Sequence, residues 1–253
     1  MLSEAEVFFC EDTRVSKRLL HLLSERFQTR FQPDPHFISL HSHNERDRLE
    51  QIDAVLFERP CVYLSDAGMP GISDPGTALI RHCQQNRIDY TVLPGANAAL
   101  VAVVDSGLGE GRFFFEGFLP HKSQARQERL KQLLAHTEPF VLYEAPTRIQ
   151  MLAGELGTLA PLAQVVFHKE LSKQHERRFI GTGASIARQL AEANLKGEWV
   201  AVIAPTQKAP EGWLIGALRE LNAPKKPLAK ILSRLDGQST AFWYDRLTHK
   251  ESP

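Results

Sequence analysis

The sequence of 253 residues is poor in cysteine, has no long apolar run and carries no net charge. Its three cysteines stand singly at Cys10, Cys61 and Cys83, which is neither the spacing of a zinc site nor an even disulfide framework. No apolar stretch approaches the roughly 20 residues that span a bilayer, and the first residues lack a signal-peptide pattern. We therefore expect a cytoplasmic protein with reduced thiols, without a metal and without a membrane segment.

Charge and length bound the class of protein further. The 30 Lys and Arg balance 30 Asp and Glu, which excludes a global attraction to nucleic acid but leaves room for a local basic patch. The length allows two domains of modest size, and glycines at 107, 109 and 111 mark the predicted boundary. The expected division is an α/β domain over residues 1–108, a second α/β domain over 112–204 and a helical tail over 205–253.

Residues 65–76 are the stretch richest in special backbone residues, with three glycines, two prolines and two aspartates. They follow the apolar run 61–64 and precede a helical pattern that starts at Thr77, so the order is strand, glycine-rich loop, helix. In an open α/β sheet such a loop lies beyond the carboxyl ends of the strands, where ligands bind. Asp66 and Asp74 disfavour a phosphate site, so we expect a ligand with hydroxyls, amines or positive charge. A purely structural turn is the alternative.

Polar or small residues also follow the other strands predicted in the first half. Residues 11–14 (Glu-Asp-Thr-Arg) follow a strand at 7–10, and Asn44 and Glu45 come shortly after one at 37–40. A second glycine loop at 94–99 follows a strand predicted at 90–93. We expect the two glycine loops to border one pocket, because adjacent parallel strands end at the same edge of a sheet. For Asp12 the alternative is helix capping. The first residues, 1–5, resemble the end of a helix, and residues 46–58 are predicted as one helix.

The second half predicts strands at 113–115, 140–143, 165–167 and 197–203. Charged groups follow two of them, at residues 144–148 and 168–173. A basic helix begins near Lys122 and is either a phosphate-binding or a solvated face. In the tail, helices are predicted at 213–221, 227–235 and 239–247, rich in basic and aromatic residues. This tail either contacts RNA or another subunit, or packs as a helical end.

Eight motifs in this order make the chain resemble the ribosomal RNA small subunit methyltransferase I family over nearly its whole length. They are Glu11-Asp12-Thr13-Arg14, His43-Asn44-Glu45, the loop at 65–76, Pro94-Gly95-Ala96, Gly117-Phe118-Leu119-Pro120, Tyr143-Glu144, Glu170-Leu171-Ser172-Lys173 and Gly197-Glu198. Members of the family have the tetrapyrrole-methylase fold. They transfer a methyl group from S-adenosylmethionine to the ribose 2′-hydroxyl of a cytidine in 16S rRNA.

The resemblance implies an α/β fold of two domains, the second with a mixed sheet, and a cofactor cleft between them, in a homodimer that acts on 16S rRNA of the small ribosomal subunit. The residues implied to face S-adenosyl-L-methionine are Asp66, Ala67, Gly68, Gly71, Ile72, Asp74, Pro75, Pro94, Gly95, Ala96 and Tyr143. Our hypothesis for the catalytic residues is Glu11, Asp12, Arg14, Asn44, Glu45 and Lys169. The residues expected to bind substrate are Lys122, Arg126, Arg148 and Lys173.

Two departures from the family pattern stand out. Family members open with one further strand and a Thr-Pro-Ile-Gly-Asn loop before the residues matched by Met1 to Ala5, and both are missing here. That strand is interior in this fold, so we expect its absence to expose backbone ladder groups and an apolar core, and we expect a trimmed sequence or a misplaced start. Ala145 and Thr147 also replace a Ser and a His that are common in the family.

Two other functions remain open at this point. A tetrapyrrole methylase that acts on a porphyrinoid carbon would share the fold and would also suit a basic cleft. A non-catalytic RNA-binding or assembly protein would bind RNA with steep salt dependence and would not bind the cofactor.

Overall fold

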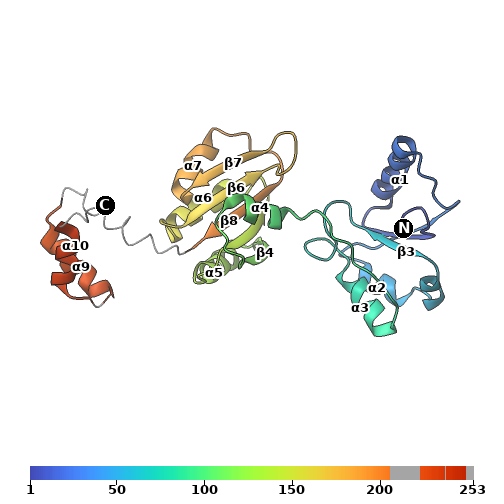
Figure 1. Ribbon diagram of the computed structural model, residues 1–253, viewed down its shortest axis with the longest axis horizontal. Coiled ribbons are helices and arrows are strands. Elements are labelled where there is room, and N and C mark those ends of the chain that lie inside the picture. Colours follow the sequence, from blue (N-terminus) through green and yellow to red (C-terminus); the bar gives the residue numbers. More distant parts are fainter. Residues whose placement is uncertain (206–222, 237, 249–253) are drawn as a thin grey trace. The chain divides into compact units, whose positions relative to one another are not determined.

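The structure, a computed structural model, describes residues 1–205, 223–236 and 238–248 (Figure 1). The chain divides into two compact units, Met1–Leu100 and the part that starts at Val101. This division falls a few residues before the glycines that mark the predicted boundary. The predicted domain limits and the cleft between the domains stay predictions.

The first unit contains a parallel sheet of three strands in the order β2-β1-β3. The strands are β1 (Val7–Cys10), β2 (His36–Ser39) and β3 (Cys61–Leu64). The helices are α1 (Thr13–Phe27), α2 (Glu45–Glu50), the 3₁₀ helix η1 (Ala54–Glu58) and α3 (Thr77–Asn86). The helix α4 (Ala98–Ser106) runs across the division between the units.

The central strand β1 is apolar and buried along its whole length. Val7 and Phe9 belong to one apolar cluster and Phe8 and Cys10 to another. Because successive side chains of a strand point to opposite faces, both faces of this sheet are covered. The loops that follow β1 and β3 start at the same edge of the sheet, because the two strands are parallel and end in register at Cys10 and Leu64.

Two predicted helices of the first unit differ from the structure. Residues 1–5 form a single hydrogen-bonded turn, in which Glu4 N and Ala5 N donate to Met1 O. The helix predicted at 46–58 is divided into α2 and η1, because Asp53 has extended backbone and its carboxylate caps η1 by accepting from Val55 N. The apolar spacing of the sequence continues across this break, which explains the prediction of one helix.

The strand predicted at 90–93 is wrong, because these residues pair with no strand in the described part of the chain. Tyr90, Val92 and Leu93 are 43–56% exposed. An apolar run becomes a strand only when a neighbouring strand supplies the ladder of hydrogen bonds, and the described sheet has none beside this segment. The loop at 94–97 nevertheless approaches the loop at 65–76, as described below.

The second unit contains a mixed sheet of five strands in the order β4-β5-β8-β6-β7, with only β4 and β5 parallel. The strands are β4 (Phe114–Phe118), β5 (Phe140–Glu144), β6 (Gln164–Lys169), β7 (Arg177–Gly181) and β8 (Trp199–Ala204). The helices are α5 (Ser123–Leu134), α6 (Ile149–Leu159) and α7 (Gly183–Ala191). β7 was not predicted from the sequence.

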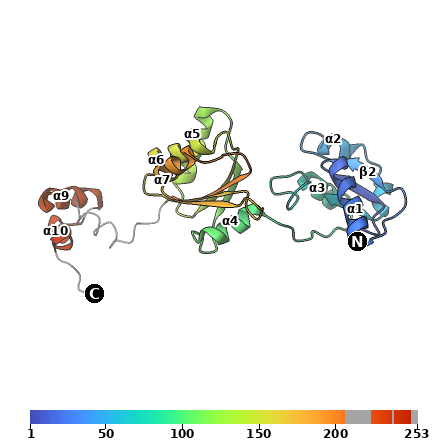
Figure 2. The ribbon, with the colours of Figure 1, turned by 90° about the horizontal axis from the view of Figure 1, so that it is seen from above.

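The three helices α5, α6 and α7 cover one face of the second sheet, and α4 lies on the opposite face (Figure 2). The main apolar cluster joins side chains of these three helices to alternate strand residues such as Phe140, Phe167 and Trp199. Gly183 lets α7 approach α6 closely, since an added Cβ there would lie 2.8 Å from Ala153 O. The described fold is thus α/β with a mixed second sheet, as predicted.

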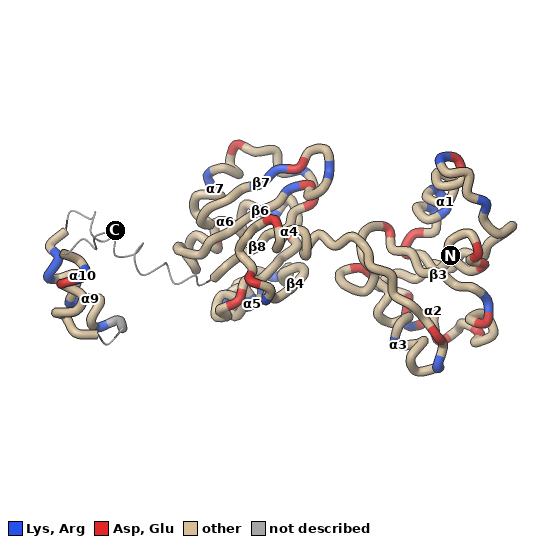
Figure 3. Tube along the Cα trace, viewed as in Figure 1, with Lys and Arg blue, Asp and Glu red and all other residues tan. Residues whose placement is uncertain are grey.

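The described C-terminal residues form a helical hairpin of α9 (Lys225–Asp236) and α10 (Thr240–Thr248). Its own small core contains Ala229, Trp243 and Leu247. Lys and Arg residues occur on both helices (Figure 3). Two of the helices predicted in the tail are confirmed with shifted ends, and the helix predicted at 213–221 lies outside the described residues.

Candidate functional site

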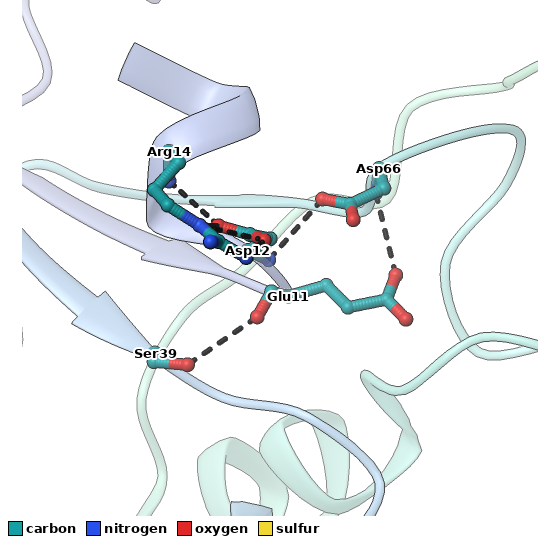
Figure 4. A network of polar contacts seen from close by, with 5 residues as sticks. All are labelled: Glu11, Asp12, Arg14, Ser39 and Asp66. Atoms are coloured by element: carbon teal, nitrogen blue, oxygen red, sulfur yellow. Dashed lines mark hydrogen bonds and ion pairs between the residues drawn. The ribbon is translucent and has the colours of Figure 1, made fainter.

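Two carboxylates, those of Glu11 and Asp66, lie beside each other beyond the ends of β1 and β3 (Figure 4). Glu11 follows β1 directly, and Asp66 lies two residues after β3. Asp66 Oδ1 accepts a hydrogen bond from Asp12 N at 3.2 Å, and Glu11 Oε2 accepts one from Asp66 N at 3.4 Å. The two strand ends are therefore joined side chain to backbone, which fixes the carboxylates of Glu11 and Asp66 beside each other.

Asp12 and Arg14 have local partners that account for their positions. Asp12 is the N-cap of α1, and its Oδ1 accepts from Arg14 N at 2.8 Å. Its carboxylate also pairs with the Arg14 guanidinium at 2.6 Å, and these bonds lower the pKa of Asp12 to about 2. Helix capping, the alternative considered from the sequence, is thus present. A catalytic role for either residue stays a prediction.

The loop at 65–76 is folded back by glycines with left-handed backbone, including Gly68 at φ 75° and Gly76 at φ 132°. Gly71 N donates to Asp74 O, which closes a tight turn. Asp74 is half-buried, and its pKa is raised by burial and, to a smaller degree, by the negative charges of Glu11 and Asp66. The turn therefore holds a third carboxylate close to the other two.

The two glycine loops of the first unit touch each other. A Cβ added to Gly68 would lie 3.2 Å from Ala96 O, and one added to Gly95 would lie 3.4 Å from Met69 Cα. The structure thus brings the two predicted groups of cofactor-facing residues together. It does so without the strand predicted at 90–93.

Asn44 and Glu45 hold the surrounding loops. The side chain of Asn44 accepts from His41 N at 2.8 Å and donates to Ser39 O at 3.2 Å. Glu45 Oε2 accepts from Gly76 N at 3.0 Å, at the start of α3. Both side chains thus join loops near the candidate site, and a catalytic role for either stays a prediction.

Arg126, predicted to bind substrate, lies in the interior of the second unit with 1% of its side chain exposed. Its guanidinium pairs with Glu144 at 2.6 Å and with Glu155 at 3.0 Å. The basic pattern of the helix predicted a surface position for Arg126, and the structure buries it instead. An RNA phosphate cannot reach the side chain in this conformation, so Arg126 is not part of the proposed site. Arg148 also pairs with Glu144, at 2.8 Å, and keeps 15% of its side chain exposed.

The other predicted residues of the second unit have mixed surroundings. Lys169 is buried with 7% exposure, and its Nζ donates to Asn194 O at 2.7 Å. Lys173 is 44% exposed and pairs with Glu198 at 2.9 Å and with Glu170 at 3.3 Å, and both carboxylates raise its pKa. Tyr143 is half-buried with its ring 5.1 Å from that of Phe115. Lys122 is exposed just before α5.

A cluster that the sequence did not reveal joins α4 to the open face of the second sheet. Asp105 accepts from His168 Nε2 at 2.7 Å and from Arg178 Nη2 at 2.5 Å. The side chain of His168 is fully buried. Burial lowers the pKa of His168, although the Asp105 carboxylate acts in the opposite direction. Asp105 lies 63 residues before His168, and Arg178 lies on β7, which was not predicted from the sequence, so no local pattern marks the cluster.

This cluster predicts a pH-dependent stability. Because the pKa of His168 is lowered, the unfolded chain binds more protons than the folded chain between that pKa and the ordinary value of 6.5. The free energy of unfolding should therefore decrease as the pH falls through this window. Urea titrations at neutral and mildly acidic pH measure the decrease, and His168→Gln should reduce it. An equal decrease in both proteins would contradict this assignment.

The carboxylates and glycines of the first unit fit S-adenosylmethionine, the cofactor that the resemblance implies. Burial and, to a smaller degree, the charges of Glu11 and Asp66 raise the pKa of Asp74, so a cationic ligand beside these carboxylates would reduce their mutual repulsion. An ammonium, a sulfonium and ribose hydroxyls suit carboxylates and exposed backbone groups. Among the described residues, no group of three or more His, Cys, Asp or Glu is arranged to hold a metal ion. The described helices include none long and apolar enough to cross a membrane.

Comparison with known proteins identifies the family of the chain. Residues 1–187 match the tetrapyrrole (corrin/porphyrin) methylase family. Ribosomal RNA small subunit methyltransferase I of Helicobacter pylori strain J99 is 42% identical, and the match covers 99% of this chain and 91% of that protein.

Solved structures share the fold at low identity. Diphthine synthase superposes with a TM-score of 0.54 at 15% identity, over 79% of each chain. Uroporphyrin-III C-methyltransferase of Thermus thermophilus, solved with S-adenosyl homocysteine, gives 0.50 at 17% identity, over 79% of this chain and 86% of that one. The chain therefore belongs to the tetrapyrrole methylase family and, within it, to ribosomal RNA small subunit methyltransferase I.

Proposed function

We propose that this chain transfers a methyl group from S-adenosylmethionine to the ribose 2′-hydroxyl of a cytidine in 16S rRNA, as a cytoplasmic homodimer. Membership of the family supports methyl transfer to ribosomal RNA. The observation that carries the cofactor assignment is the meeting of Glu11, Asp66 and Asp74 beside two touching glycine loops. The solved relative with S-adenosyl homocysteine supports the same cofactor class.

The residues of the two glycine loops hold the cofactor in this proposal. Asp66 and Asp74 supply negative charge, and Gly68 and Gly95 leave backbone atoms open to close approach. The bound cofactor supplies a methyl group already activated by a positively charged sulfur. The protein then has to orient the ribose hydroxyl and accept its proton.

The proton acceptor is proposed among Glu11, Glu45 and Lys169. Glu11 and Glu45 have carboxylate oxygens at the candidate site, where each accepts one backbone hydrogen bond. Lys169 is a buried amine that donates a hydrogen bond to Asn194 O. Lys122, Arg148 and Lys173 are proposed to contact RNA phosphates, since each keeps part of its side chain exposed.

The test is methylation of isolated small ribosomal subunits with labelled cofactor. We expect label in 16S rRNA that survives as 2′-O-methylcytidine after digestion to nucleosides. A porphyrinoid substrate in a parallel reaction should remain unlabelled. Label on a base or on the porphyrinoid would overturn the proposed substrate, and no cofactor binding by the folded chain would overturn the proposal as a whole.

A glycine substitution tests the contact between the loops. Gly68→Ala should lower the affinity for S-adenosylmethionine, because the new Cβ meets Ala96 O at 3.2 Å on a left-handed backbone. Gly107→Ala is the matched control, since Gly107 also has positive φ but no atom within 4 Å of an added Cβ. Both changes should cost about 1–3 kcal/mol of stability. Calorimetric titration should show weakened binding only for Gly68→Ala, and equal affinities would contradict the contact.

A further inference from the structure

The helical hairpin of α9 and α10 carries an excess of positive charge in a chain that is neutral as a whole. Between residues 223 and 248 the sequence has five Lys or Arg and two Asp. No residue of this hairpin belongs to the site proposed above. Its charge therefore needs a separate explanation.

Three of these cations form a row on one face of α9. Lys226, Lys230 and Arg234 follow one another at intervals of four residues, and all three are exposed. Side chains four residues apart lie on the same helix face, so the row extends over about 12 Å. Leu228 and Leu232 lie on the opposite face of α9, where they pack against the cluster of Ala229, Trp243 and Leu247. Among the side chains that the structure describes, which leave out that of Asp236, no carboxylate forms an ion pair with any cation of the row.

An exposed aromatic ring lies beside one end of this row. Tyr244 is 45% exposed, whereas its neighbour Trp243 is 5% exposed and packs in the hairpin core. Tyr244 lines a surface hollow together with Lys226, Thr240 and Ala241. A cation and an aromatic face thus border the same hollow.

We propose that the hairpin binds unpaired RNA, with Lys226, Lys230 and Arg234 on successive phosphates and Tyr244 stacked on a base. Cations along a helix neutralise the backbone, and aromatic side chains stack on unpaired bases of any sequence. A protein partner fits less well, because Ile231 and Tyr244 are the only large apolar or aromatic side chains exposed among the described residues of the hairpin. The inference rests on the proposed function, in that the RNA is the ribosomal substrate.

The test compares RNA affinity of the full chain and of the triple variant Lys226→Gln, Lys230→Gln, Arg234→Gln. Binding of an unpaired RNA oligonucleotide is followed by fluorescence anisotropy between about 50 and 200 mM salt. We expect the affinity to fall at least about tenfold and the slope of log K against log salt to become shallower by about 2, since each single-strand contact contributes about 0.7. The matched control is Arg18→Gln, Arg81→Gln, Arg188→Gln, which removes the same charge from exposed positions elsewhere.

The aromatic part of the inference has its own pair of variants. Tyr244→Leu should weaken binding of unpaired RNA, while Tyr244→Phe should preserve it, because both rings stack and leucine does not. Circular dichroism of each variant checks that the helices remain. A triple variant that binds RNA like the control, or a parent chain that binds no RNA, would overturn the inference.

These measurements need neither the cofactor nor methyl transfer. If the parent binds RNA through the row but methylates no ribosomal RNA, the proposed function fails and the RNA-binding hairpin stands. If methylation occurs while both triple variants bind alike, the hairpin is not an RNA-binding surface and the proposed function stands.

Discussion

Replacement of Arg126 by Met is expected to lower the free energy of unfolding of the second unit by about 3–5 kcal/mol. Arg126 lies between Glu144 and Glu155, whose side chains are 0% and 12% exposed. Removal of the guanidinium breaks the ion pair of Glu155 with Arg126 and leaves Glu144 paired with Arg148. Buried carboxylates that lose a cation account for most of this effect.

Arg129 provides the control from the same helix. It also makes paired hydrogen bonds to a carboxylate, Glu116, but is 41% exposed. Arg129→Met should therefore cost no more than about 1 kcal/mol. All three tryptophans follow residue 100, so their fluorescence during urea unfolding reports on the second part of the chain and not on the first unit. Similar losses for the two variants would mean that Arg126 is not structurally distinct from a surface arginine.

Most strands could be predicted because each is a short apolar run that ends at a turn or a charged group. This holds for β1, β5 and β8, whose residues are almost all buried. The missed strand, β7, begins with two arginines and buries only Phe179, as an edge strand does. The order of the second sheet could not be predicted, since β8 enters between β5 and β6 and is antiparallel to both.

Prediction from the sequence failed where the position of a residue depends on contacts with distant elements. The sequence shows that Arg126 lies on a helix rich in basic residues. Its burial depends on ion pairs with Glu144 of β5 and Glu155 of α6, which the local sequence does not reveal. The segment 90–93 failed for a related reason, because its apolar residues do not specify a pairing strand. The edge of the first sheet was predictable, since the ends of parallel strands meet wherever the register is preserved.

Removal of two carboxylates from that edge should nearly abolish binding of S-adenosylmethionine. We expect the variant Asp66→Asn, Asp74→Asn to bind at least about 100-fold more weakly, because each lost charged hydrogen bond contributes about 1.5–3 kcal/mol. Asp47→Asn, at an exposed position in α2, removes a charge from the same unit and should bind like the parent. Calorimetric titration of the three proteins measures the difference.

The raised pKa of Asp74 adds a second signature, with opposite signs for binding and for stability. As the pH falls through this pKa, protonation removes the negative charge that the cofactor needs, so binding should weaken. The same protonation stabilises the free protein, because the folded chain takes up the proton at a higher pH than the unfolded chain, whose Asp titrates near 3.8.

Asp74→Asn should remove both effects, since its amide does not titrate in this range. The change in affinity with pH and the change in stability with pH should therefore be smaller in this variant than in the parent, and Asp47→Asn should retain both. If the parent binds the cofactor but Asp74→Asn shows the same pH dependence, the charge that the cofactor needs comes from other residues, with Glu11 and Asp66 the nearest candidates.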